Sequence, residues 1–188
     1  MGAWGAIIMG FFGSAFGALT LYWALNIRGL DLGAPFIAFG MIAVAAWRVL
    51  RAPGAGIVPS KEIEKVITWA SIAEGVGLFI AANIVMNLHR PDLLMPAMAL
   101  VVGLHFFPIA LAAKFRPFVW LGLALLLSSL VGFSLPQPSG GIVSGCMAAC
   151  GLWLASFFAL IREQRAKEAS LSAGPASGMD HIGCSLNP

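Results

Sequence analysis

The sequence predicts an all-α membrane protein that crosses the bilayer six times. Of its 188 residues, 60% are hydrophobic and 10% are charged, whereas soluble domains carry about 25% charged residues. The mean hydropathy is +0.91, and the apolar residues fall in runs, most of which approach or exceed the roughly 17 to 20 residues needed to cross the hydrocarbon layer. A water-soluble fold could not bury this much apolar surface. Helices are expected because a helix satisfies its own backbone hydrogen bonds within lipid.

Polar turns and breaks divide the chain into these spans. Ser60 is expected to cap the third helix, which therefore begins before the bilayer, with Lys61 and Lys65 in its first turns. Residues 136–141 are rich in Pro and Gly and form a tight turn. The expected spans, paired as helical hairpins, are about residues 5–25, 34–50, 66–88, 93–113, 118–135 and 142–161. Residues 1–168 make up the bundle, and residues 169–188, rich in Ser, Gly and Ala, are expected to be a disordered tail.

Small and aromatic residues add detail to this picture. Gly13 and Gly17 form a G-x-x-x-G spacing, which lets another helix approach closely. Tryptophans are enriched where spans meet the interface. Five of the six fall near predicted span ends, and Trp153 does not.

The basic residues predict the topology. One side of the predicted bundle collects nine basic side chains, whereas the other has only Arg28 and Arg90. Because basic loops stay in the cytoplasm, both termini are expected to be cytoplasmic, and the protein is expected in the cytoplasmic membrane. The net charge of +3 therefore serves topology, and no nucleic-acid partner is expected. The lipid bilayer is the predicted partner, and a homo-oligomer or a larger membrane complex is left open.

A weak internal repeat relates the first two hairpins. At an offset of 61 residues, Glu74 corresponds to Gly13 and His105 to Val44, so the two ionisable residues are an addition to one hairpin. The offset implies a duplicated hairpin in parallel orientation. The identities that define it are Asn26 with Asn87, Asp31 with Asp92, Leu32 with Leu93, Pro35 with Pro96 and Ala38 with Ala99.

Glu74 and His105 are the only ionisable side chains deep within apolar runs. In an antiparallel hairpin that turns between His89 and Arg90, facing residues have numbers that sum to 179, and these two do. They are therefore predicted to lie at one depth. A charge near the bilayer centre costs about 2.5 to 3.5 kcal/mol, so the carboxyl group should be paired, and an imidazole can supply the partner.

Pro108 adds to this candidate site. A proline within a helix leaves a carbonyl, here that of Leu104, without its usual donor, and this carbonyl is adjacent to His105. A protonatable pair beside a free acceptor resembles a proton or cation relay. The sequence thus points to a small proton-linked transporter or channel, or a subunit of one. The alternative is a scaffold or accessory subunit in which the pair only holds helices together, and an intramembrane enzyme is less well supported.

Two amides lie farther along the third span. Asn83 is set opposite Pro96, where its amide could satisfy the backbone group that the proline exposes. Asn83 and Asn87 share a helical face that points away from Glu74. Both are interpreted as supporting packing residues.

The remaining candidates argue against a metal or a cofactor. Cys146 and Cys150 lie on one helical face without a His or an acid in their span, which favours packing. Cys184, with Asp180 and His181, provides too few ligands for a metal site. No common catalytic motif occurs, so neither enzyme activity nor a cofactor is predicted.

The run Gly103, Leu104, His105, Phe106, Phe107, Pro108, followed by Lys114 and Phe115, resembles an uncharacterised group of small bacterial multi-span membrane proteins. These proteins carry a similar G-L-H-F-x-P run. The resemblance covers the fourth span and its exit loop. It implies an integral membrane protein and no established activity.

Overall fold

A computed structural model describes residues 2–172, which fold into six long helices without a strand. Each helix is long and apolar enough to cross a membrane, which confirms the predicted all-α, six-span architecture. Two short 3-10 turns, η1 (Leu30–Gly33) and η2 (Pro91–Leu93), precede α2 and α4. The helices are α1 (Ala3–Trp23), α2 (Ala34–Arg51), α3 (Lys61–Asn87), α4 (Leu94–Ala113), α5 (Arg116–Ser134) and α6 (Ser139–Ser172).

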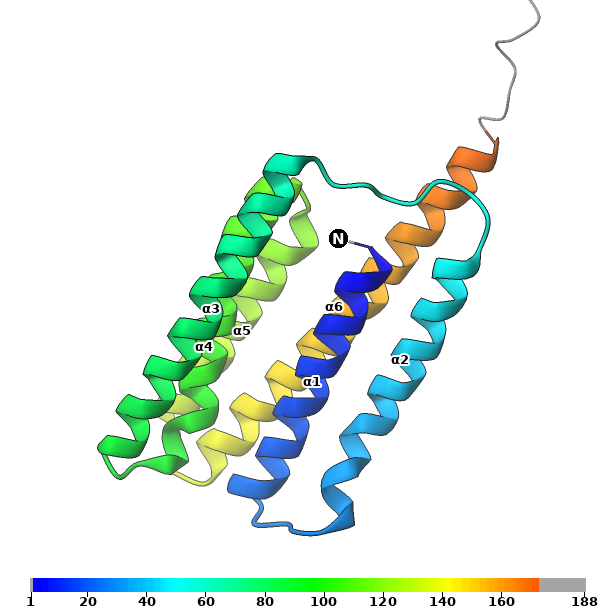
Figure 1. Ribbon diagram of the computed structural model, residues 1–188. Helices are drawn as coiled ribbons and strands as arrows, with labels where there is room; N and C mark the ends of the chain where they lie inside the picture. The colour runs from blue at the N-terminus through cyan, green and yellow to red at the C-terminus, as the bar shows by residue number, and fades with distance from the viewer. Residues whose placement is uncertain (1, 173–188) are drawn as a thin grey trace, which may run out of the picture.

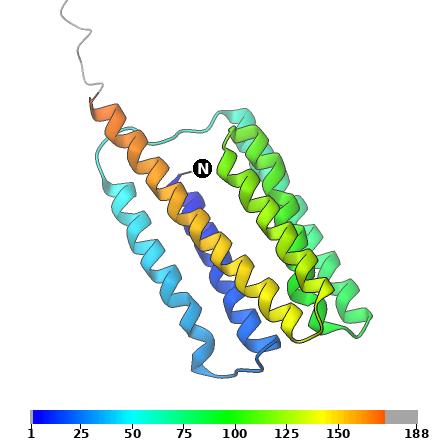
Figure 2. The ribbon, with the colours of Figure 1, turned by 180° about the vertical axis from the view of Figure 1, so that it is seen from behind.

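The helices form two groups of three, α1, α2 and α6 on one side and α3, α4 and α5 on the other (Figures 1 and 2). Within the bundle α6 packs along α1 and α5, and α5 packs along α4. The helices α2 and α3 occupy opposite flanks, while α1 and α4 touch each other at few positions. The chain therefore has a tight centre around α5 and α6 and a looser junction between α1 and the α3–α4 hairpin.

The first two hairpins have similar turns, but their second helices differ in how deeply they are buried. Asp31 and Asp92 each lie in the first turn of a 3-10 helix, and Pro35 and Pro96 lie in the first turn of the following α-helix. A proline is tolerated there because that backbone N–H has no helical partner. However, 6% of the apolar stretch of α2 is buried, compared with 56% of that of α4. The repeated local sequence thus occurs in a flanking helix and in a central one.

The glycine motif of α1 brings two neighbouring helices close. A methyl group at Gly13 would lie 2.8 Å from the Trp153 ring of α6, and one at Gly17 would lie 2.9 Å from the Pro35 ring of α2. Ser14 joins the same helices, because the Trp153 indole N–H donates to its hydroxyl (3.3 Å) and that hydroxyl donates to the Pro35 carbonyl (2.7 Å). Trp153 lies away from the span ends because it packs between helices.

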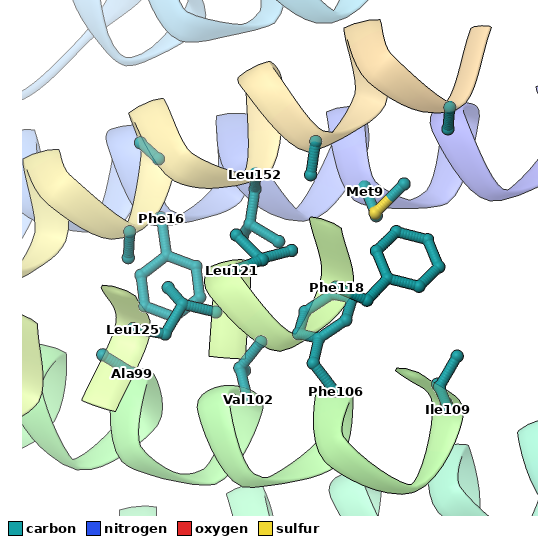
Figure 3. Packing of buried hydrophobic residues seen from close by; sticks show 14 of the residues in the cluster. Met9, Phe16, Ala99, Val102, Phe106, Ile109, Phe118, Leu121, Leu125 and Leu152 are labelled. Atoms are coloured by element: carbon teal, nitrogen blue, oxygen red, sulfur yellow. The ribbon is translucent and has the colours of Figure 1, made fainter. Parts of the chain in front are cut away.

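The core lies between α1 and α6 on one side and α4 and α5 on the other. Figure 3 shows Phe16 and Leu152 from the first pair directed toward Leu125 and Val102 of the second. Small residues permit this approach. The Ser128 hydroxyl of α5 donates to the Ser144 carbonyl of α6 over 2.9 Å, which satisfies a polar group inside the core.

The last helix continues to Ser172, past the expected span end at residue 161, and its polar extension clasps the α2–α3 loop. Lys167 Nζ donates to the carbonyls of Leu50 and Ala52 (3.0 and 2.9 Å). The Ile57 N–H donates to Glu163 Oε2 over 3.3 Å. Lys167 and Glu163 are buried, and these contacts explain why the helix extends beyond the apolar run. The rest of the predicted tail, residues 173–188 with Asp180, His181 and Cys184, lies outside the described residues.

Candidate functional site

Glu74 and His105 face each other across the α3–α4 hairpin. His105 Nε2 lies 3.4 Å from Glu74 Oε2, and their side chains are 8% and 12% exposed. The structure therefore places the two residues opposite each other, as the counting predicted. Regular helices on both sides of the turn make this possible, because α3 is unbroken from Lys61 to Asn87 and α4 from Leu94 to Ala113.

A second contact orients the imidazole. His105 Nδ1 lies 3.0 Å from the carbonyl oxygen of Ala70, one helical turn before Glu74. Since a carbonyl oxygen only accepts, we assign a hydrogen to Nδ1. Nε2 is then the atom that faces the carboxyl group.

At a separation of 3.4 Å, one further proton can be shared between Nε2 of His105 and Oε2 of Glu74. If the proton is on Nε2, the pair is an imidazolium and a carboxylate. If it is on the carboxyl group, both side chains are neutral. The pair carries no net charge in either state. Loss of this proton alone would leave a carboxylate facing an imidazole lone pair, in a setting where an unpaired charge is costly.

The pair lines a cavity of about 340 Å³ between α1 and the α3–α4 hairpin. Gly5, Met9 and Phe12 belong to the α1 wall. Exposed residues Ile8 of α1 and Ser71 and Gly75 of α3 also line it, so the cavity reaches the surface between these helices. The α4 and α6 walls are Val102, Phe106 and Leu152, which belong to the core as well. The two ionisable groups therefore adjoin an accessible and otherwise largely apolar space.

Pro108 is not part of this constellation. It lies within α4, as expected, but on an exposed side of the helix and away from the cavity lining. The acceptor beside His105 is the Ala70 carbonyl of α3, and not the Leu104 carbonyl that the sequence suggested. A neighbouring helix supplies this acceptor, which no local rule about proline could indicate.

Asn83 and Asn87 are exposed on α3 and do not line the cavity. The Asn83 amide donates to the Phe79 carbonyl within its own helix over 2.7 Å. The predicted contact with Pro96 is wrong. Pro96 belongs to the first turn of α4, where the proline leaves no helical hydrogen bond unmade.

Sequence reasoning overlooked Ser71 and the α1 wall. Ser71 precedes Glu74 by three residues, so helical spacing alone places both on one face. No comparable signal identifies Ile8, Met9 or Phe12, because only the packing of α1 brings them to the α3–α4 hairpin.

The two cysteines of α6, which the sequence analysis interprets as packing residues, are free and exposed. Cys150 lines an outer groove between α2 and α6. Within residues 2–172, no group of three or more His, Cys, Asp or Glu side chains is placed to hold a metal ion.

The fold and this site define a multi-span helical membrane protein with an acid–histidine pair beside an interhelical cavity. No protein-family model matches the sequence, and comparisons with curated proteins and with solved structures find no match either.

Proposed function

We propose that the protein is a small proton-linked transporter or channel, or a subunit of one, in which Glu74 and His105 form the protonatable site. The observation that carries this proposal is the position of the pair on the wall of an accessible cavity of about 340 Å³. A pair with only a structural role has no need of such a space. Ionisable residues within spans commonly mark the paths of protons or ions.

The proposed setting is a bacterial inner membrane with both termini in the cytoplasm. The support is the distribution of lysine and arginine, nine of which fall on the side of the termini in the predicted topology. Reporter fusions after Gly56 and after His89 test this orientation. Cytoplasmic activity at the first site and periplasmic activity at the second are expected, and the reverse pattern would contradict it.

The second candidate is a scaffold or accessory subunit in which the pair is structural. The bond between His105 and the Ala70 carbonyl favours it, because it fastens α3 to α4. Only 11% of the apolar stretch of α3 is buried. Because this flanking helix makes few buried contacts, a hydrogen bond to α4 contributes noticeably to its attachment.

Proton flux into proteoliposomes separates the two candidates. Purified protein is reconstituted with a pH-sensitive dye inside the vesicles, and protons are driven inward by a potassium diffusion potential or, for coupled exchange, by a cation loaded inside the vesicles. Wild-type protein should acidify the lumen faster than empty vesicles do. Glu74→Gln should abolish the increase, because an amide cannot exchange the proton.

Matched variants on exposed positions control for reconstitution. Glu62→Gln changes a carboxyl group in the first turn of the same helix, and His89→Ala removes an imidazole from the outer turn. Both should retain wild-type flux. If Glu74→Gln matched these controls, or if the wild type carried no more flux than empty vesicles, the transport proposal would be rejected and the structural role favoured.

A further inference from the structure

The cavity beside Glu74 and His105 has a wall composition that restricts its ligand. Among the described residues that line it, these two alone are ionisable, and Ser71 adds one hydroxyl group. The remaining lining residues are glycine or carry apolar side chains. Its volume of about 340 Å³ is at the lower end of the usual range for small-molecule sites, about 300 to 1,000 Å³. The space suits one compact molecule that is mainly apolar.

The ionisable groups of the cavity favour a positively charged ligand over a negatively charged one. No lysine or arginine is among the described residues that line it, so an anion would have only His105 as a charged partner, and that residue already faces a carboxyl group. A cation would meet the carboxylate of Glu74. Phe12 and Phe106 are also among the lining residues, and aromatic side chains attract cations.

We infer that this cavity binds a lipophilic monovalent organic cation, of the substituted ammonium or phosphonium kind, in exchange for the proton held between Glu74 and His105. The inference rests on the proposed function, since it assigns a substrate class to the same protonatable pair. The exposed positions Ile8, Ser71 and Gly75 at the cavity edge give such a molecule a route from the membrane, where lipophilic cations accumulate.

The exchange balances in charge and protons. Before binding, the pair is neutral and holds one proton between Nε2 and Oε2. When the cation arrives, the bond to that proton breaks and the proton passes to water. Glu74 remains as a carboxylate against the cation, while His105 remains neutral with its Nδ1 hydrogen on the Ala70 carbonyl. The site is neutral again, so one cation replaces one proton, and binding strengthens as the pH rises.

Equilibrium binding of tetraphenylphosphonium to the full-length protein in lipid nanodiscs tests this exchange. In weak buffer, we expect saturable binding with one proton released per cation. The affinity should increase up to about tenfold per pH unit over the range in which the proton is held. Glu74→Gln should reduce the affinity at least tenfold, whereas Glu62→Gln should bind as the wild type does.

A second variant tests the cavity without altering the ionisable groups. Gly75 lines the cavity, and a methyl group added there would meet nothing within 4 Å. Gly75→Leu should therefore fold and add bulk at the cavity edge, with a loss of binding. Gly40→Leu places the same side chain on the open face of α2 and should leave binding unchanged.

Three results would overturn the inference: absence of saturable binding, binding that survives Glu74→Gln, or binding without proton release. Failure of the inference is distinguishable from failure of the proposed function. Proton flux that requires Glu74, in a protein that does not bind the cation, rejects the lipophilic cation alone. Cation binding with proton release, in a protein without flux, supports the site and rejects transport.

Discussion

The hairpins α1–α2 and α3–α4 share a turn pattern but differ in the contacts that their helices make. In the first, the absence of side chains at Gly13 and Gly17 lets α1 lie close to α6 and to α2, respectively. In the second, the position that corresponds to Gly13 is Glu74, which meets His105 across a polar contact. Close contacts hold α1 against its neighbours, whereas a polar contact joins α3 to α4. The cavity lies between α1 and the second hairpin. The comparison shows that two hairpins with the same turn pattern are fastened to their neighbours in different ways, by close packing or by a polar contact.

The largest expected effect comes from blocking the close approach of α6 to α1. Gly13→Leu should destabilise the protein by roughly 3 kcal/mol, because the Trp153 ring and the Ala149 carbonyl stand within 3.1 Å of the added carbon. The midpoint of unfolding in mild detergent measures this effect. Gly40→Leu, on the exposed face of α2, is the control and should unfold near the wild type. Equal midpoints for the two variants would refute the assigned role of Gly13.

Removing one partner of the polar contact should have a smaller effect on stability. His105→Ala should cost about 1 to 2 kcal/mol, since it leaves the Glu74 carboxyl group without a partner and removes the bond to Ala70. A double-mutant cycle with Glu74→Gln should give a coupling free energy of about 0.5 to 1.5 kcal/mol. Strictly additive effects would show that the two side chains do not interact.

Breaking the contact between the end of α6 and the α2–α3 loop should affect mainly that loop. Lys167→Met removes the two donors to the carbonyls of Leu50 and Ala52, and about 1 kcal/mol of stability should be lost. Amide hydrogen exchange in residues 52–57 should accelerate more than in the helices, because a loop opens independently of the core. Arg165→Met, at an exposed position on the same helix, is the control. Unchanged exchange in that loop would contradict the clasp.

The smallest expected effect concerns the hydrogen-bond chain of the first hairpin. Ser14→Ala removes both the donor to the Pro35 carbonyl and the acceptor of the Trp153 indole. Interhelical hydrogen bonds in membranes contribute about 0.6 kcal/mol on average, so a loss of that order is expected in the unfolding midpoint. A loss as large as that of Gly13→Leu would mean that hydrogen bonding, rather than close approach, holds this hairpin.

The sequence by itself determined the class of the protein and the facing positions of its polar pair. Apolar runs must cross a membrane as helices, because no other local structure satisfies their backbone in lipid. Two regular helices joined by a short turn have a fixed correspondence of depth, which is why simple counting placed Glu74 opposite His105. Likewise, the G-x-x-x-G spacing indicated a close approach, and α1 has one at each glycine.

Only the tertiary structure decided which helices meet. Contacts between distant segments depend on the packing of the whole bundle, so no local pattern could place α1 against the α3–α4 hairpin to form the cavity. The same reason explains the Ala70 carbonyl as the partner of His105 in place of the Leu104 carbonyl beside Pro108. It also explains why α6 extends to Ser172, because Lys167 binds carbonyls at the C-terminal end of α2, more than one hundred residues earlier in the chain.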